Sequence, residues 1–288
     1  MSRKAAIKFL ALVVGICVIT ASVFVAQKLM KRTTSFSRLG SSAQKIHPVF
    51  TIQLPETKDS DGSFTCTGLS HDTVENVFWG GYYGKTDPED VNLRPALIKL
   101  DMDFNILDEI PLDLFAGENP KMSLQGVAFD SVDNSLWFTD SESIYELDKS
   151  GRLLRILEID ELQNPNGLAF DSRTNSLWVL GYRSYLANIK KNGTIIQIIK
   201  CNYFDQDQIM ILGNKIYFTV GADYRGDQNY LGVVDIPTGR VSCYAKLSES
   251  YAVEGCCMVE DKLYVFNDGF YHDCAIKENI VQVYDWIE

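Results

Sequence analysis

Five short apolar stretches of this sequence each carry an oxygen-bearing side chain directly before a glycine or, in one case, a glutamine. The oxygen-bearing residues are Thr67, Gln125, Asn166, Asp207 and Glu254, and the residues that follow them are Gly68, Gly126, Gly167, Gln208 and Gly255. Carboxylate and amide oxygens in such a set can bind a hard cation such as Ca²⁺, which takes about six to eight oxygen ligands. The alternative is a hydrogen-bonded ring of polar side chains and water that holds no ion.

These stretches are equivalent because the chain repeats itself. Leu124–Asp140 reads LQGVAFDSVDNSLWFTD, and Pro165–Gly181 reads PNGLAFDSRTNSLWVLG, with Gly167 placed 41 residues after Gly126. Each copy contains an apolar strand, a polar turn rich in Asp and Asn, and a second strand that carries Trp. The alternating segments that follow break at Ser-Gly or Asn-Gly, which is a hairpin signal. One unit is therefore four antiparallel strands, the content of one β-propeller blade.

Weaker copies complete a ring of units. They open at Phe64–Trp79, Asp207–Thr219 and Glu254–Asn267, so the sequence predicts an all-β, five-bladed β-propeller over residues 47–288. Six blades is the alternative, because residues 80–120 are long enough to hold a further hairpin. The last unit has only three strands, and residues 47–54 form a spare strand ahead of the first unit. We therefore expect this strand to complete the last blade and close the ring.

The first strand of each propeller blade lines the central channel, so the five oxygen-bearing residues are expected to form a ring at one mouth. Strands one and two of a blade are antiparallel, and the loops after strand two therefore open at the same mouth. These loops are rich in aromatic and charged residues, which is typical of a ligand site, although packing over the blades is the alternative. The predicted ligand-binding residues are Trp79, Tyr82, Tyr83, Arg94, Asp140, Tyr182, Arg183, Tyr224, Arg225, Asp268, Tyr271 and His272.

PNGLAF (165–170) and the repeated G-x-A-F-D…N-S-L-W pattern resemble the calcium-dependent six-bladed propellers of the gluconolactonase/SMP-30 and NHL-repeat group. They are still more similar to the periplasmic SdiA-regulated propellers. In the gluconolactonase group the metal ligands are acidic or amide residues just before blade glycines. The resemblance thus implies a Ca²⁺ site that uses Gln125, Asn166, Asp207 and Glu254. The chain departs from the pattern at Thr67 and at Gln208.

The charge of the chain is divided unevenly along its length. Residues 1–46 hold eight basic and no acidic residues, which leaves 19 basic and 38 acidic residues, a net charge of −19, for residues 47–288. A body this acidic repels phosphate backbones, so we expect no nucleic-acid partner.

The N-terminal segment has no charged residue from Phe9 to Ala26, about the shortest run that spans a bilayer. We predict a cytoplasmic tail and transmembrane signal anchor at residues 1–26, with the membrane contact at residues 5–26, and a basic linker at residues 27–46. The propeller is then extracytoplasmic, either periplasmic or at the cell surface. A cleaved signal peptide and a cytosolic domain held at the inner membrane surface are the alternatives.

Two functions are consistent with these patterns. The first is a membrane-anchored propeller that binds a small molecule or a protein at the mouth, around Ca²⁺ in one version, without catalysis. The second is a Ca²⁺-dependent hydrolase of lactone or ester type. In that hydrolase the metal polarises a carbonyl, and Asp207, Glu254 or His272 assists a water molecule. Of the six cysteines beyond Cys17, Cys274 with Cys256 or Cys257 is the first candidate disulfide, and buried thiols are the alternative.

Overall fold

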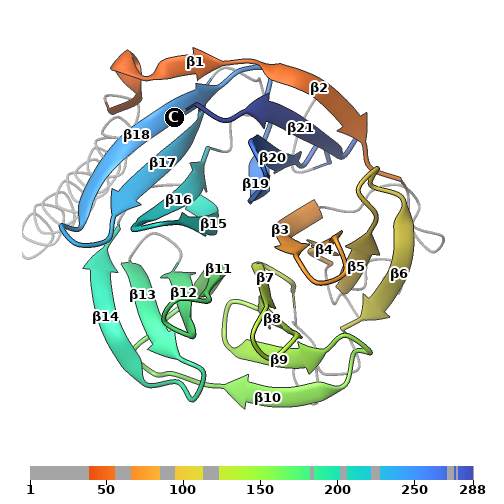
Figure 1. Cartoon of the computed structure of the whole chain (residues 1–288), viewed down its shortest axis with the longest axis vertical. Coiled ribbons are helices and arrows are strands. Elements are labelled where there is room, and N and C mark those ends of the chain that lie inside the picture. Colours follow the sequence, from red (N-terminus) through yellow and green to blue (C-terminus); the bar gives the residue numbers. More distant parts are fainter. Residues whose placement is uncertain are drawn as a thin grey trace, which may run out of the picture.

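Five β-sheets are arranged around a central axis in a computed structural model of the chain (Figure 1). The structure describes residues 39–55, 66–84, 95–112, 123–181, 185–201, 206–221, 228–270, 276 and 278–287. The five-bladed all-β propeller is therefore confirmed. The six-bladed alternative is wrong, because the strands that the structure describes after β4 in this region, β5 (Ala96–Leu100) and β6 (Ile106–Pro111), complete blade 1.

Each blade is numbered here by the chain order of its innermost strand. Blade 1 contains β3 (Cys66–Asp72), β4 (Val77–Tyr82), β5 and β6. Blade 2 contains β7 (Val127–Asp130), β8 (Ser135–Thr139), β9 (Ile144–Asp148) and β10 (Leu153–Leu157). Blade 3 contains β11 (Pro165–Asp171), β12 (Ser176–Gly181), β13 (Tyr185–Lys190) and β14 (Ile195–Lys200). Blade 4 contains β15 (Gln206–Leu212), β16 (Lys215–Val220), β17 (Asn229–Asp235) and β18 (Arg240–Leu247), and blade 5 contains β19 (Val253–Val259), β20 (Lys262–Asn267), β21 (Ile280–Asp285) and β2 (Pro48–Gln53).

The ring is closed by the N-terminal part of the described chain. Strand β2 pairs antiparallel with β21 as the outermost strand of blade 5, as the sequence predicts. A shorter strand, β1 (Gln44–Ile46), follows the 3₁₀ turn at Gly40–Ser42 and adds in parallel to β18. Residues 44–46, which the sequence assigns to the linker, are thus paired with blade 4, and β1 and β2 run along the rim of two adjacent blades (Figure 1).

The polar turns between strands one and two form for a local reason. The carboxylates of Asp72 and Asp130 each accept the backbone N–H two residues further on, at 2.9 Å. Asn76, Asn134 and Asn175 close the three equivalent turns with φ values of 54°, 54° and 49°. Asn tolerates this left-handed conformation better than most residues, so the repeated Asp and Asn determine the turn.

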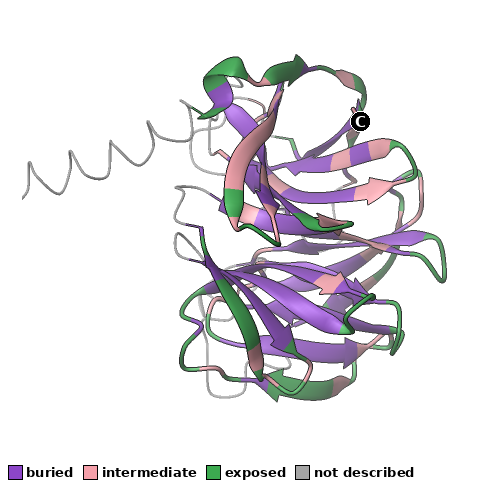
Figure 2. Ribbon diagram, turned by 60° about the vertical axis from the view of Figure 1, so that its left-hand side comes forward, coloured by how far each residue is buried: buried purple, intermediate pink, exposed green. Residues whose placement is uncertain are grey.

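The core is divided among the spaces between neighbouring blades. The repeated tryptophans Trp79, Trp137 and Trp178 are all buried, and they pack in clusters that join one blade to the next. Figure 2 shows the burial continuing through the inner strands, whereas the exposed segments lie at the turns and outer edges. Cys66, Cys201, Cys243, Cys256 and Cys257 are free thiols, and Cys274 lies outside the described residues.

The predicted transmembrane anchor, residues 1–26, lies outside the part of the chain that the structure describes. Within the described ranges, no helix is long and apolar enough to cross a bilayer.

Candidate functional site

The polar residues before the glycine positions meet around the start of the innermost strands. Asn166 donates from Nδ2 to Oδ1 of Asp207 in the next blade, at 3.1 Å. The Thr67 hydroxyl donates to the backbone carbonyl of Gln125 at 2.7 Å. Gln125, Asp207 and Glu254 are half-buried, so they remain accessible from the mouth. We call these residues, with Thr67 and Asn166, the mouth ring.

The glycine layer below the mouth ring is the tightest part of the channel. A Cβ on Gly126 would lie 2.3 Å from the backbone oxygen of Asn166, and one on Gly167 would lie 2.3 Å from that of Asp207. A Cβ on Gly255 would lie 2.6 Å from the carbonyl carbon of Gly68. Backbone of one blade thus fills the space where a side chain of its neighbour would stand, which explains why glycine recurs at these positions.

Gln208, the only non-glycine in this layer, closes the channel. Its Oε1 accepts the backbone N–H of Leu168 in blade 3 at 2.7 Å, and its Nε2 donates to the carbonyl of Val127 in blade 2 at 3.1 Å. The side chain therefore crosses from blade 4 to two other blades, and only 2% of the residue is exposed. Gln208 thus lies between the mouth ring and the opposite end of the channel and links blades 2, 3 and 4 there.

The mouth ring contains oxygen atoms of the kinds that bind a hard cation. Asp207 and Glu254 supply two carboxylates, and Gln125 and Asn166 supply amide oxygens. Asn166 presents its nitrogen to Asp207, however, and Gln125 donates from Nε2 to the Ser123 hydroxyl at 3.2 Å. The donor types fit Ca²⁺, while the arrangement seen is the hydrogen-bonded one. Ion binding would require Asn166 to turn its amide oxygen toward the ion.

A buried thiol lies beside the acidic side of the mouth ring. Burial raises the pKa of Cys66 well above its usual value, and the negative charges of Asp268 and Glu254 raise it further. Cys66 begins β3, and Asp268 directly follows β20, so both stand at the mouth end of their strands. Asp268 thus adds a third carboxylate to this side of the mouth. The neutral thiol that results is unsuited to act as a nucleophile.

Three of the predicted ligand-binding residues, Trp79, Tyr82 and Asp140, make hydrogen bonds within the protein. Trp79 does not reach the mouth: it is fully buried between blades, and its Nε1 lies 3.5 Å from Oδ2 of Asp72 at the other end of β3. Asp140 uses one oxygen to accept two backbone N–H groups of its own turn and the other to accept the Tyr145 hydroxyl at 2.7 Å. The Tyr82 hydroxyl donates to the carbonyl of Pro55 at 3.3 Å.

The remaining predicted ligand-binding residues are divided between two groups. Tyr83 is half-buried and Asp268 is buried, both at the mouth ends of their blades. The residues that lie outside the described part of the chain are Arg94, Tyr182, Arg183, Tyr224, Arg225, Tyr271 and His272. The ligand-binding and catalytic roles of these residues stay predictions.

A second acidic cluster, which the sequence did not single out, joins blades 2 and 3. Carboxylate oxygens of Asp130, Asp133 and Glu146 lie within 4.8 Å of one another, a spacing that could hold a metal ion. Lys191 of blade 3 forms ion pairs with Asp130 and, at 2.9 Å, with Asp133, and Arg155 pairs with Glu146 at 3.1 Å. Protein cations therefore already neutralise this cluster.

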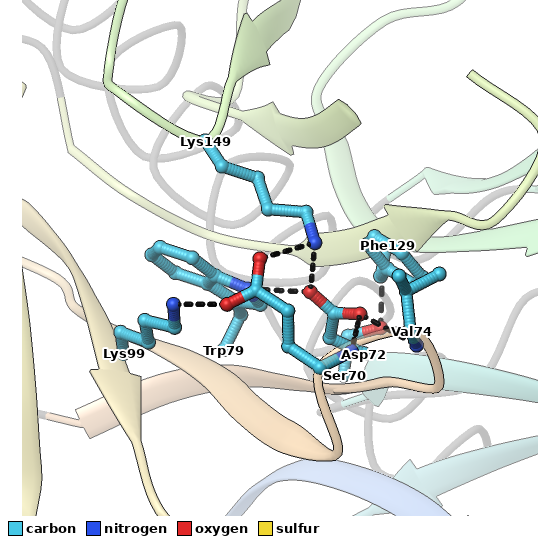
Figure 3. A network of polar contacts seen from close by, with 8 residues as sticks. Ser70, Asp72, Val74, Trp79, Lys99, Phe129 and Lys149 are labelled. Atoms are coloured by element: carbon cyan, nitrogen blue, oxygen red, sulfur yellow. Dashed lines mark hydrogen bonds and ion pairs between the residues drawn. The ribbon is translucent and has the colours of Figure 1, made fainter. Parts of the chain in front are cut away.

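Blade 1 carries the equivalent cluster, drawn in Figure 3. Lys149 of blade 2 reaches across to Asp72 at 2.6 Å and to Glu75 at 2.7 Å, and Lys99 pairs with Glu75 from the same blade. Asp72 has no exposed side-chain surface. The repetition of the arrangement at two successive interfaces indicates that these carboxylates join blades.

The other end of the channel is a pocket of about 240 Å³ that is lined by apolar side chains and by the hydroxyl residues Ser70, Thr73, Ser131 and Ser172. Its floor consists of the residues after the glycine layer: Leu69, Val127, Leu168, Ile209 and Cys256. Its wall consists of the residues two positions further on: His71, Phe129, Phe170, Ile211 and Met258. We call it the distal pocket. Sequence reasoning missed it, although the signal was present, since side chains two apart on each first strand face the same way.

The similarity of this chain to known proteins is limited to the fold. No protein-family model and no curated protein matches the chain. A glutaminyl cyclase from Myxococcus xanthus is 9% identical, with a TM-score of 0.57 over 85% of this chain and 100% of that one. A nidogen–laminin complex is 16% identical, with a TM-score of 0.51 over 75% and 79%. A gluconolactonase from Xanthomonas campestris is 12% identical, with a TM-score of 0.45 over 84% of this chain and 98% of that one.

The described chain is thus a five-bladed β-propeller with a closed channel. The closer similarity to SdiA-regulated propellers stays a prediction, because no family match tests it.

Proposed function

We propose that this protein is a binding protein that engages its ligand or protein partner at the mouth ring through a cation, of which Ca²⁺ is the first candidate. The observation that carries the proposal is the pair of half-buried carboxylates, Asp207 and Glu254, above a channel that Gln208 closes. With Gln208 across the channel, a ligand that enters at the mouth would stay beside these carboxylates rather than pass through. The proposal includes the anchor at residues 5–26 and an extracytoplasmic propeller.

Within this proposal, Gln125, Asn166, Asp207 and Glu254 would hold the Ca²⁺, and the ion would present free coordination positions to an oxygen-bearing ligand. The body's net charge of −19 supports a cationic partner. Sites built for an ion are stabilised by it, because binding to the folded state alone shifts the unfolding equilibrium.

Thermal unfolding of the full-length protein in CaCl₂ and in excess chelator tests the ion. At a Ca²⁺ concentration about 100-fold above Kd we expect the Tm to rise by about 5–10 °C. The double variant Asp207→Ala with Glu254→Ala should abolish the rise. The matched control, Glu158→Ala with Asp160→Ala, removes two exposed carboxylates elsewhere and should keep it. Equal melting with and without Ca²⁺ would overturn the cation-dependent site.

The alternative is the Ca²⁺-dependent hydrolase of lactone or ester type, with Asp207, Glu254 or His272 assisting a water molecule. It predicts turnover of a panel of lactones and aryl esters that chelation abolishes. A Ca²⁺-dependent rise in Tm without turnover supports the binding protein, whereas chelator-sensitive turnover supports the hydrolase. Membrane attachment is tested separately, by asking whether deletion of residues 1–26 releases the protein from membranes.

A further inference from the structure

We propose that the distal pocket is a second binding site, which takes a small neutral aromatic molecule carrying one hydrogen-bond donor. The pocket lies at the opposite end of the channel from the mouth ring, so the inference is independent of the proposed function. Gln208 separates the two ends, since its side chain bonds blades 2, 3 and 4 together between them.

The lining of the distal pocket excludes charged ligands. None of the residues that line it is Asp, Glu, Lys or Arg, although the body of the chain is strongly charged. A charge placed there would lose its hydration without gaining a partner, which is costly. An uncharged ligand is therefore favoured, and Phe129 and Phe170 in the wall offer aromatic surface for it to contact.

The size of the pocket defines the ligand further. Its volume of about 240 Å³ exceeds the roughly 150 Å³ cavity known to take up benzene, and it is below the range of drug-sized sites. A bicyclic aromatic ring matches this size. The pocket is too small to seat a folded segment of another protein, for which an interface needs several hundred Å².

Two aromatic side chains of the wall are held in place before any ligand arrives. The ammonium group of Lys149 lies 4.9 Å from the centre of the Phe129 ring, and that of Lys191 lies 4.8 Å from the centre of the Phe170 ring. Both lysines are themselves held by the ion pairs between blades. Rigid walls reduce the entropy lost on binding, which favours a defined site.

His71 supplies the polar contact. His71 lines the pocket, and its Nε2 lies 3.1 Å from the side-chain oxygen of Asn76. An amide oxygen only accepts, so the tautomer that satisfies this contact carries its proton on Nε2. In a neutral imidazole the other nitrogen, Nδ1, is then an acceptor. A ligand N–H or O–H can donate to it, as the N–H of an indole would.

Fluorine NMR titration of the full-length protein with 5-fluoroindole tests the site. We expect a Kd of the order of 0.1 mM, given the few atoms of the probe. 5-Fluoroindole-2-carboxylate, which is charged, should bind at least about tenfold more weakly. No binding of 5-fluoroindole up to the millimolar range, or equal binding of the carboxylate, would overturn the proposal.

Two adjacent substitutions in one exposed turn locate the site. Ser131→Trp covers the pocket rim and should weaken binding at least about tenfold, whereas Val132→Trp, whose residue does not line the pocket, should leave it unchanged. Both residues are exposed, so both variants should fold, as a circular-dichroism melt would verify. Equal binding by the two variants would place the probe elsewhere.

A third variant tests the hydrogen bond. His71→Phe should lower the affinity for 5-fluoroindole about three- to tenfold, the usual worth of one hydrogen bond. It should leave the affinity for 5-fluoro-1-methylindole, which has no donor, unchanged. If both probes respond alike, the assignment of His71 as the acceptor is wrong.

Discussion

The interfaces between blades 1 and 2 and between blades 2 and 3 contain buried ion pairs, whereas the equivalent positions between blades 4 and 5 and between blades 5 and 1 are apolar. In the charged interfaces a lysine after the third strand of one blade reaches the aspartate that ends the first strand of its neighbour. The pairs are Lys149 with Asp72 and Lys191 with Asp130. The apolar counterparts are Trp286 with Leu212 and Met102 with Val259, each pair within one core cluster.

The interface between blades 3 and 4 is intermediate. Asp171 is present, but the position of the reaching lysine holds Ile236. Arg173 from the same turn pairs with Asp171 at 2.9 Å and also donates to Asn214 of blade 4 at 2.9 Å. The Nε1 of Trp178 is buried without a hydrogen-bond partner among the described residues, whereas Trp79 and Trp137 both donate to their aspartates.

The alternation of charged and apolar interfaces can keep near-identical blades in one order around the ring. The charge of a lysine that follows the third strand of one blade is compensated only where the first strand of the neighbouring blade ends in aspartate. Against Leu212 or Val259 the same ammonium group would be buried without a partner, which costs several kcal/mol. The matched pairs therefore favour the observed blade order over a shifted one.

The largest expected effect comes from breaking one charged interface. Lys191→Met leaves the fully buried Asp130 uncompensated, so we expect the free energy of unfolding to fall by about 3–5 kcal/mol. Adding Asp130→Leu, which copies the apolar interfaces, should restore part of the loss. Recovery is incomplete because Asp130 also accepts two backbone N–H groups of its turn. Urea unfolding gives the free energy of unfolding of wild type, Lys191→Met and the double variant. If Lys191→Met is as stable as wild type, the charged interface does not depend on this ion pair.

How much of this was predictable varies from residue to residue. The Asp and Asn of the repeated turns, and the spare strand at residues 47–54, followed from local pattern, and both are found in the structure. Lys149 and Lys191 stand at equivalent positions in the repeat, but the sequence does not show that each reaches a different blade. The sequence shows that Gln208 replaces the glycine of the other four blades. Its position across the channel, however, depends on contacts with residues up to 81 positions away, which the sequence does not show.

An apolar interface should respond less strongly. Trp286 stacks on Tyr244 with ring centres 4.4 Å apart and meets Tyr217 edge-on at 4.9 Å, while remaining partly exposed. Trp286→Ala should lower the free energy of unfolding by about 2 kcal/mol, less than for a fully buried Trp. Trp286→Phe, the control, should retain most of the stacking. Denaturation at low and high salt should give the same loss, and a strong salt dependence would show that this interface is not apolar in character.

The smallest expected effect concerns the exposed part of a charged interface and depends on pH. Hydrogen bonds from Lys149 and, next, Lys99 lower the pKa of Glu75 from 4.5 to about 2. A carboxyl group whose pKa is lowered by folding stabilises the folded protein at pH values above the pKa that the group has in the unfolded chain. This contribution is lost as the pH falls from about 4.5 toward 2. Glu75→Gln should therefore make the decline in Tm over this range shallower than in wild type. Glu260→Gln, in the equivalent turn of apolar blade 5, should leave the decline unchanged. Parallel profiles for wild type and Glu75→Gln would show that solvent already screens the pair, so that the buried Asp72 alone carries the charged interface.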